Sequence, residues 1–332
     1  MSDAGLLEVS DLSVRFRTDE APVHAVDNLS FTLHEREILA VVGESGCGKS
    51  VSALAVLGLL PPAGEMVSGS IRLDGVDLAG LSAAQLRAIR GKDISMVFQE
   101  PMTSLNPVLR VGHQIAEVLR RHEGVSRRAA RSRAVELLSL VGIPAPQSRV
   151  DDYAHQMSGG MRQRVMIAMA LACNPKVLIA DEPTTALDVT IQAGILDLMR
   201  EVRDRFGTAI VLITHDLGVV ADMADRAIVM YAGRKVEEAR IDELFAHPQH
   251  PYTMGLLGAV PHPGQAASAG EQRRLTEIRG RVPVLHEPAG HCAFAPRCDR
   301  ADDLSRAQLP QLHEERPGHL VACFHPGREG GA

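Results

Sequence analysis

The chain has 332 residues, a formal net charge of −6, 45% hydrophobic residues and 23% charged residues. This is the composition of a globular protein with one large domain and an appendage or with two modest domains, so global disorder is excluded. Aromatic residues make up 3% and tryptophan is absent. Since the chain lacks both excess positive charge and stacking platforms, we expect no nucleic-acid partner.

The apolar runs bear on how the chain relates to membranes. No basic residue precedes Arg15, so we expect no secretory signal at the N-terminus. The longest uninterrupted apolar run, residues 165–173, is far shorter than the roughly 20 residues that span a bilayer. Any role at a membrane is therefore expected to depend on partner proteins.

Strands are predicted within residues 6–42, and the last of them, residues 37–42, ends at a glycine-rich segment that matches GxxxxGK[ST]. Glycines let successive backbone N–H groups face phosphate oxygens, and the following helix start adds partial positive charge. Lys49 is expected to reach the β and γ phosphates, and Ser50 to bind Mg²⁺. The predicted ATP-binding loop comprises Gly43, Glu44, Ser45, Gly46, Cys47, Gly48, Lys49 and Ser50. The alternative is a glycine-rich turn without ligand, and the motif alone also fits GTPases and kinases.

Short strands are predicted at residues 70–98, and the character changes between about 108 and 172, where residues 114–121 and 127–140 have helical periodicity. Another buried strand, residues 177–180, ends at two carboxylates. Asp181 is expected to hold Mg²⁺, and Glu182 to polarise the attacking water. A helix at 189–206 and a strand at 209–213 follow. This alternation predicts an α/β layer with a parallel sheet.

Residues 157–164 resemble the signature motif of the ABC ATPases. Gln99 matches the Q-loop of that family, Asp188 its D-loop and His215 its switch histidine, while Phe16 occupies the place of the aromatic residue that stacks on adenine. The order and spacing agree from about residue 6 to residue 257. The nucleotide motifs are therefore similar to those of an ABC ATPase over some three quarters of the chain.

The resemblance implies a P-loop, RecA-like ABC ATPase core with an α-helical subdomain and a short C-terminal extension. It places the nucleotide-binding domain at residues 1–257, with the helical subdomain at about 108–172, and a linker and cysteine-containing extension at 258–332. ATP and Mg²⁺ are the implied ligands, and two such domains close head to tail over two nucleotides. The implied catalytic residues are Glu182, His215 and Gln99, the Mg²⁺ ligands are Ser50, Gln99 and Asp181, and the signature residues that act on the partner's ATP are Ser158, Gly159, Gly160 and Met161.

Three segments, residues 98–107, 181–190 and 250–253, are similar to those of the oligopeptide/dipeptide/nickel importer ATPases, in particular the dipeptide-type D subunits. This resemblance implies an ATP-hydrolysing subunit that powers the import of peptides. The subunit itself is expected to lie on the cytoplasmic face of the cell membrane, as a peripheral protein. The implied partners are a second, different ABC ATPase subunit, two transmembrane permease subunits and an extracellular substrate-binding protein. Residues 100–112 and the helical region beyond are expected to dock on the permease.

Other functions stay open at this point. One is a soluble ABC ATPase in translation or DNA repair, although such proteins typically fuse two ATPase domains or insert a coiled coil, and this chain has one phosphate loop. Another is an importer for nickel or another small solute. A third is a regulatory module that holds ATP without turnover, against which the intact Glu182 and His215 argue.

The five cysteines are odd in number and unevenly spaced, which favours reduced thiols or metal ligation over a disulfide framework. Cys292, Cys298 and Cys323 lie in a tail that resembles the one in which some family members carry four cysteines for an iron–sulfur cluster. Ser305 occupies the place of the missing cysteine. A [4Fe-4S] cluster completed by a histidine and a Cys₃His zinc site are both left open, but three reduced thiols are the preferred interpretation. The nearby histidines are His291, His313, His319 and His325.

Overall fold

The computed structural model describes residues 5–100, 104–185, 189–259 and 278–327, which belong to two compact units. The first unit comprises residues 1–8, 32–38 and 72–213, and the second comprises 9–31, 39–71 and 214–332. Each unit is thus assembled from segments that are far apart in the sequence. Within the described ranges, no helix has both the length and the apolarity that crossing a membrane would require.

A parallel sheet forms the centre of the first unit, in the order β6 (Ile94–Val97), β7 (Val177–Asp181) and β8 (Ala209–Ile213). Every residue of these three strands is buried. A parallel strand covered on both faces requires a nearly continuous apolar run, which is why these segments are apolar almost throughout. Asp181 is the last residue of β7, so this strand delivers a carboxylate to the carboxyl edge of the sheet.

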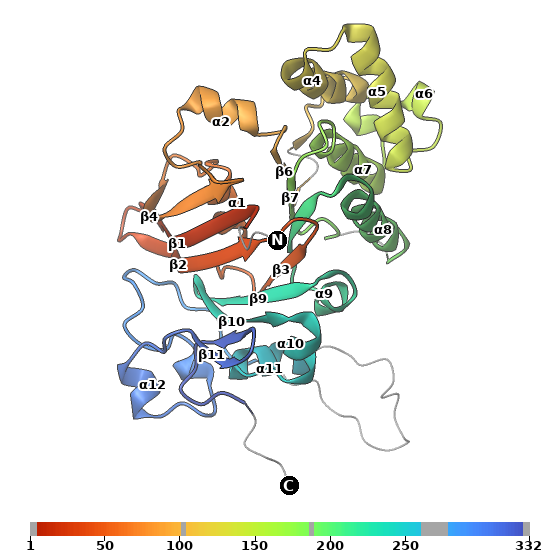
Figure 1. The fold of residues 1–332 in the computed structure, drawn as a ribbon. Helices are drawn as coiled ribbons and strands as arrows, with labels where there is room; N and C mark the ends of the chain where they lie inside the picture. The colour runs from red at the N-terminus through yellow and green to blue at the C-terminus, as the bar shows by residue number, and fades with distance from the viewer. Residues whose placement is uncertain (1–4, 101–103, 186–188, 260–277, 328–332) are drawn as a thin grey trace, which may run out of the picture. The chain divides into compact units, whose positions relative to one another are not determined.

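The helices of the first unit include a group in which α4 packs on α5 and α7, and α5 also packs on α6 (Figure 1). The helix 127–140, the helix 189–206 and the strand 209–213 have the predicted bounds. Helix α4 begins at Val111, three residues before the predicted start. The backbone N–H groups of Val111 and Gly112 donate to the carbonyls of Asp152 and Val150, so this longer helix has partners for its first turn that periodicity does not reveal. The remaining elements of the unit are β5 (Val76–Asp77), α2 (Ala83–Ile89), α4 (Val111–Glu123), α5 (Arg127–Leu140), α6 (Pro146–Arg149), η1 (Ala154–Gln156), α7 (Gly159–Ala170) and α8 (Val189–Phe206).

Two sheets lie within the second unit, one with β1 between β2 and β4, and one in the order β11-β12-β10-β9-β3. Strands β3 and β9 are parallel, and the other pairs of the second sheet are antiparallel. The strands are β1 (Leu7–Phe16), β2 (Val23–Leu33), β3 (Ile38–Val42), β4 (Gly64–Leu73), β9 (Arg226–Tyr231), β10 (Arg234–Arg240), β11 (His313–Arg316) and β12 (His319–Val321). The helices are α1 (Lys49–Val56), α9 (Leu217–Met223), α10 (Ile241–Ala246), α11 (Pro251–Gly258), η2 (Ala295–Arg297) and α12 (Asp303–Ala307).

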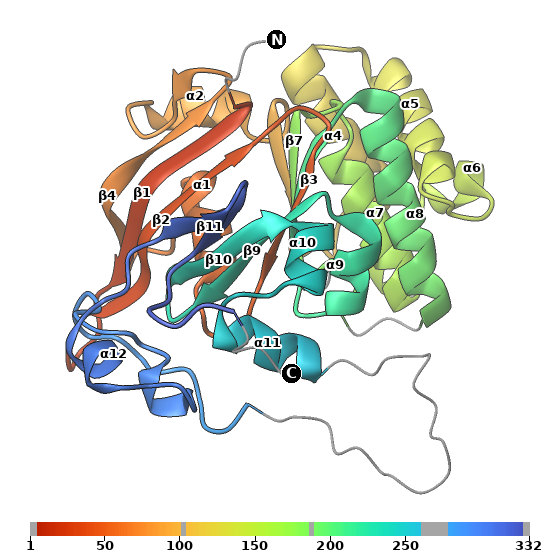
Figure 2. The ribbon, with the colours of Figure 1, turned by 60° about the horizontal axis from the view of Figure 1, so that its bottom comes forward.

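The C-terminal tail, by which we mean residues 278–327, is built into the second unit. Its strand β12 pairs with β10, with Val321 opposite Glu237, and β11 adds to β12 (Figure 2). The side chain of Phe294 is 5% exposed, and its ring lies 5.2 Å from that of Tyr231 and 5.4 Å from that of Tyr252. The tail therefore supplies a strand and a core side chain to this unit.

Candidate functional site

The phosphate loop connects β3 to α1 in the second unit. Lys49 is buried at the first position of α1, and its Nζ donates to the carbonyl oxygens of Gly43 (2.7 Å) and Glu44 (3.0 Å). The ammonium is thus held across the loop, where it can exchange carbonyl oxygens for phosphate oxygens. Burial raises the pKa of the Cys47 thiol, so this side chain is a neutral, inert part of the loop.

Two glycines of the loop are required by their surroundings. Gly48 has a φ of 98°, and a Cβ atom there would lie 2.3 Å from the Ala25 carbonyl oxygen. Gly43 has a φ of 150°, and its Cβ would lie 2.3 Å from the Met230 carbonyl oxygen. Both positions need a backbone that other residues rarely adopt and a close approach that a side chain forbids.

Glu44, the second residue of the motif, is held on three sides. Its backbone N–H donates to the Tyr252 hydroxyl (2.8 Å), and its carbonyl accepts from Lys49. Its carboxylate accepts from both terminal nitrogens of Arg297 in the tail, at 2.6 and 2.9 Å. This carboxylate is the main cause that raises the pKa of the Arg297 guanidinium above its usual value.

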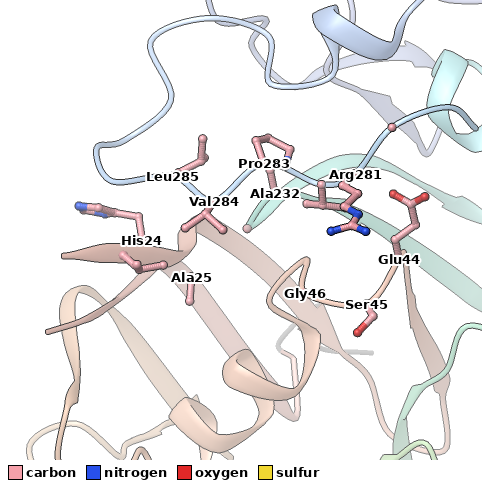
Figure 3. A pocket seen from close by; sticks show the side chains of 14 residues that line it. His24, Ala25, Glu44, Ser45, Gly46, Ala232, Arg281, Pro283, Val284 and Leu285 are labelled. Carbon is pink, nitrogen blue, oxygen red and sulfur yellow. The ribbon is translucent and has the colours of Figure 1, made fainter. Parts of the chain in front are cut away.

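A pocket of about 450 Å³ lies beside the phosphate loop. Loop residues 44–46 line one side and tail residues 280–285 line the other, with the Arg281 side chain directed toward the loop (Figure 3). The backbone N–H of His24 donates to the carbonyl of Leu285 at 2.8 Å, which ties this stretch of the tail to the start of β2. The C-terminal tail therefore forms one wall of this pocket, and residues 23–25 and 232–233 complete the lining.

Two more predicted residues lie in the second unit. Phe16 ends β1, and its half-buried ring lies against Gly64, where a Cβ atom would be 2.9 Å from the ring. The ring is thus placed on β4, with part of its surface open to solvent. His215 follows β8, is exposed, and immediately precedes Asp216, whose side chain caps α9 by accepting from Gly218 and Val219. Helix capping therefore fixes the backbone next to the candidate switch residue.

The two predicted carboxylates follow one another at the end of β7 in the first unit. Asp181 is 4% exposed, whereas Glu182 is half-buried. Glu182 has a φ of 45°, a left-handed conformation that costs a residue with a side chain energy and that is often found at functional positions. The two neighbouring carboxylates thus differ in burial, which suits two separate roles.

The structure brings Gln99 and Glu182 together. The Gln99 side-chain amide donates to Glu182 Oε2 at 3.0 Å, and the Thr185 hydroxyl donates to the same oxygen at 2.8 Å. In addition, the Gln163 amide of α7 donates to the Pro183 carbonyl at 2.8 Å. The contacts of Thr185 and Gln163 were not predicted, although Thr185 lies in the motif after the carboxylates.

The signature residues form the start of α7. Ser158 is the N-cap, with its hydroxyl accepting from the Met161 N–H, and Ser158 and Gly159 are exposed. Gly160 is buried against Ile191, whose side chain lies 2.8 Å from where its Cβ would be. An exposed helix start of this kind presents backbone N–H groups to an anion. The D-loop residue Asp188 lies outside the described residues.

The three tail cysteines line one small pocket of about 20 Å³ together with Ser305. They are free and half-buried, and burial raises the pKa of Cys292 and that of Cys323, the latter to about 11. The Ser305 hydroxyl donates to Asp302 at 2.6 Å, so it is committed to a carboxylate. Within the described part of the chain, no group of three or more His, Cys, Asp or Glu side chains is arranged to hold a metal ion. This donor set does not fit a cluster held by four thiolates.

Known families and proteins resemble this chain over most of its length. The family model described as ABC transporter matches residues 26–185, and the model described as oligopeptide/dipeptide transporter, C-terminal region, matches residues 236–303. A probable peptide ABC transporter ATP-binding protein of Sinorhizobium fredii is 52% identical over 96% of this chain and 94% of its own length. An oligopeptide transport ATP-binding protein of Bacillus subtilis is 52% identical over 97% of this chain and 89% of its own length. A dipeptide transport ATP-binding protein of Haemophilus influenzae is 48% identical over 98% and 97%.

Among solved structures, a dimeric ATP-binding cassette in a post-hydrolysis state with ADP and phosphate has a TM-score of 0.65 and 28% identity. It covers 71% of this chain and 98% of its own length. The predicted P-loop fold class is therefore confirmed, and the chain is an ATPase that uses ATP and Mg²⁺. Together with the matching tail and the full-length relatives, these likenesses show that the chain belongs to the oligopeptide/dipeptide family of ABC transporter ATP-binding subunits.

Proposed function

We propose that the chain hydrolyses ATP to power the import of peptides. The observation that supports this proposal is the sequence identity to peptide transport proteins over nearly the whole chain. The relatives of 48–52% identity are described as peptide, oligopeptide and dipeptide transport ATP-binding proteins. The tail supports the same conclusion, because it matches the C-terminal region of these transporters. The nucleotide chemistry itself does not select the cargo.

ATP is held, in this proposal, by the phosphate loop of residues 43–50, with Phe16 stacking on the adenine. Lys49, whose Nζ donates to the loop carbonyls of Gly43 and Glu44 at 2.7 and 3.0 Å, would bind the β and γ phosphates instead. Ser50, Asp181 and Gln99 would hold Mg²⁺. The ion supplies charge neutralisation at the phosphates when it is bound.

Glu182 is proposed to orient and deprotonate the attacking water, with His215 and Gln99 assisting. The hydrogen bonds from Gln99 and Thr185 to Glu182 Oε2, at 3.0 and 2.8 Å, hold the carboxylate in one orientation. A carboxylate that is already fixed in position loses less conformational entropy when proton transfer begins. The signature residues 158–161 are assigned to contact the γ-phosphate bound by a partner ATPase subunit. Asp188 is assigned to the same interface between the two ATPase subunits.

The assembly that we propose contains a second, different ATPase subunit, two transmembrane permease subunits and an extracellular substrate-binding protein. The chain would work peripherally on the cytoplasmic face, docked through residues 100–112 and the helices beyond. Residues 1–257 form the nucleotide-binding domain in this scheme, with the helical subdomain at about 108–172. Residues 258–332 form the linker and extension. We assign the tail cysteines a structural role as reduced thiols, and iron or zinc bound stoichiometrically to the purified chain would refute this assignment.

The test is uptake in the host of the protein. The gene for this chain is deleted, and the strain is complemented with the wild type or with Lys49→Ala. Labelled dipeptide, labelled oligopeptide and labelled nickel are supplied in parallel. We expect the wild type but not the variant to restore peptide uptake, with nickel uptake unchanged throughout.

Two results would contradict the proposal and identify the alternative. Nickel uptake that follows the wild-type gene while peptide uptake does not would assign the chain to a metal importer. No change in uptake, together with a purified wild-type chain that associates with ribosomes or DNA and not with membranes, would favour the soluble ATPase.

A further inference from the structure

The charged side chain of Arg297 is buried, although this residue belongs to the C-terminal tail. Its side chain is 5% exposed, and its guanidinium lies over the rings of Tyr231 (5.7 Å) and Phe294 (5.9 Å). A cation removed from water needs hydrogen-bond partners, and a planar fork of donors is best matched by a carboxylate. The position of this side chain is therefore set on several sides at once.

The guanidinium joins two separate structures. On one side, both terminal nitrogens bind the Glu44 carboxylate of the phosphate loop, at 2.6 and 2.9 Å. On the other side, Nε donates to the carbonyl of Arg279 at 2.7 Å and a terminal nitrogen donates to that of Ile278 at 3.1 Å. These carbonyls lie where the tail enters the pocket wall opposite the loop. One side chain thus bridges the phosphate loop and the tail segment that faces it.

The bridge acts on the part of the loop that accepts a hydrogen bond from Lys49, the lysine assigned to phosphate binding. The Glu44 carbonyl accepts from Lys49 Nζ at 3.0 Å, and the Glu44 N–H is held by the Tyr252 hydroxyl. Tyr252 itself packs edge-on against Tyr231, with ring centres 4.8 Å apart. A carboxylate fixed by a two-pronged ion pair limits how far the Glu44 backbone can move. The loop conformation and the docking of the tail are consequently linked.

We propose that Arg297 is a positioning residue for nucleotide binding, which couples the docking of the C-terminal tail to the conformation of the phosphate loop through Glu44. The proposal rests on the assignment of residues 43–50 as the phosphate site. Coupling is reciprocal, so bound nucleotide must also stabilise the docked tail. The cysteine-bearing tail is then part of the nucleotide site's support and not an independent appendage.

The experiment measures the affinity of the full-length chain for a fluorescent ATP analogue with Mg²⁺. The variants are Arg297→Met, Glu44→Gln and the double variant. We expect each single variant to weaken binding about 10-fold, within the range typical of coupled sites. The double variant should bind nucleotide as tightly as the single variant with the lower affinity, because both substitutions remove the same interaction. Glu44→Gln keeps the size of its half-exposed side chain, so it tests the proposal even if Arg297→Met does not fold.

Arg300 offers a matched control in the same tail. One terminal nitrogen donates to the His325 carbonyl at 3.2 Å and the other to Met254 Sδ of α11 at 3.5 Å. Among the described residues, Arg300 thus holds the tail together and to α11 and is not a hydrogen-bond partner of Glu44. Arg300→Met should leave nucleotide affinity unchanged. Amide exchange gives a second readout, since nucleotide should slow exchange in residues 279–298 of the wild type and not of Glu44→Gln.

Three results would overturn the coupling: unchanged affinity in both single variants, additive losses in the double variant, or an equal loss in Arg300→Met. Lys49→Ala separates this failure from failure of the phosphate site itself. If Lys49→Ala loses affinity while Arg297→Met and Glu44→Gln do not, only the coupling is wrong. If Lys49→Ala also binds normally, the phosphate-site assignment is wrong and the coupling falls with it.

Discussion

Replacing Glu182 with glutamine tests the proposed chemistry directly, because the structure allows the structural cost and the catalytic cost to be separated. The carboxylate oxygen Oε2 accepts from Gln99 and Thr185. An amide oxygen can accept both hydrogen bonds in the same place, so the loss is that of charge assistance, about 1 kcal/mol. The replaced group cannot take a proton from water, and losing a positioned base costs about 10²–10⁴-fold in turnover.

This catalytic loss corresponds to about 3–5 kcal/mol of barrier, several times the structural cost. We therefore expect Glu182→Gln to keep its nucleotide affinity and its melting temperature within a few degrees, while steady-state ATP hydrolysis in the assembled transporter nearly stops. Thr185→Val is the matched control, because it removes one hydrogen bond to the same oxygen and keeps the charge. Its turnover should fall by less than about 10-fold.

The assay is phosphate release by the assembled complex, with nucleotide binding measured on the same preparations. Near-normal hydrolysis in Glu182→Gln would refute the assignment of the base. An equal loss in Thr185→Val would show instead that the local geometry, and not the carboxylate charge, limits the reaction.

Three further predictions concern the second unit. Lys49→Ala should weaken ATP binding about 10–100-fold, as expected for lost hydrogen bonds to charged groups, with an unchanged circular dichroism spectrum; a fluorescence titration that gives wild-type affinity would contradict it. Burial lowers the pKa of His250 from 6.5 to about 4. The unfolded chain therefore binds a proton more readily, and stability decreases as the pH is lowered from 6.5 to about 4. At pH 5 this one group removes about 2 kcal/mol relative to pH 7.5, and His250→Asn should lack that share of the loss in urea unfolding while still capping α11. His319 Nε2 lies 2.7 Å from the Glu237 carboxylate, and both side chains are buried. His319→Ala should therefore destabilise the second unit by about 1–3 kcal/mol, measured by urea unfolding. An unfolding midpoint equal to that of the wild type would contradict this prediction and would mean that water replaces the histidine.

The sequence determined those features whose parts are adjacent in the chain. The phosphate loop is one strand, one turn and one helix start, so its glycines, Lys49 and Ser50 are recognisable as a single string. Helix 127–140 and strand 209–213 have the predicted bounds, because a helix period or an apolar run is local information. Order and spacing of such strings also sufficed to indicate the family, which the comparisons confirm.

Only the tertiary structure decided which distant side chains meet. Gln99 and Glu182 are 83 positions apart, and the parallel pairing of β6 with β7 brings their strand ends to one edge. Arg297 and Glu44 are 253 positions apart, and the sequence around Arg297 looks like an appendage to the ATPase domain. The strand β12 has three residues and β11 is wholly exposed, so neither carries a periodic signal. Pairs of this kind form between residues that are distant in the sequence, so no local sequence pattern predicts them. In the Arg297–Glu44 pair, the partner compensates the burial of the guanidinium.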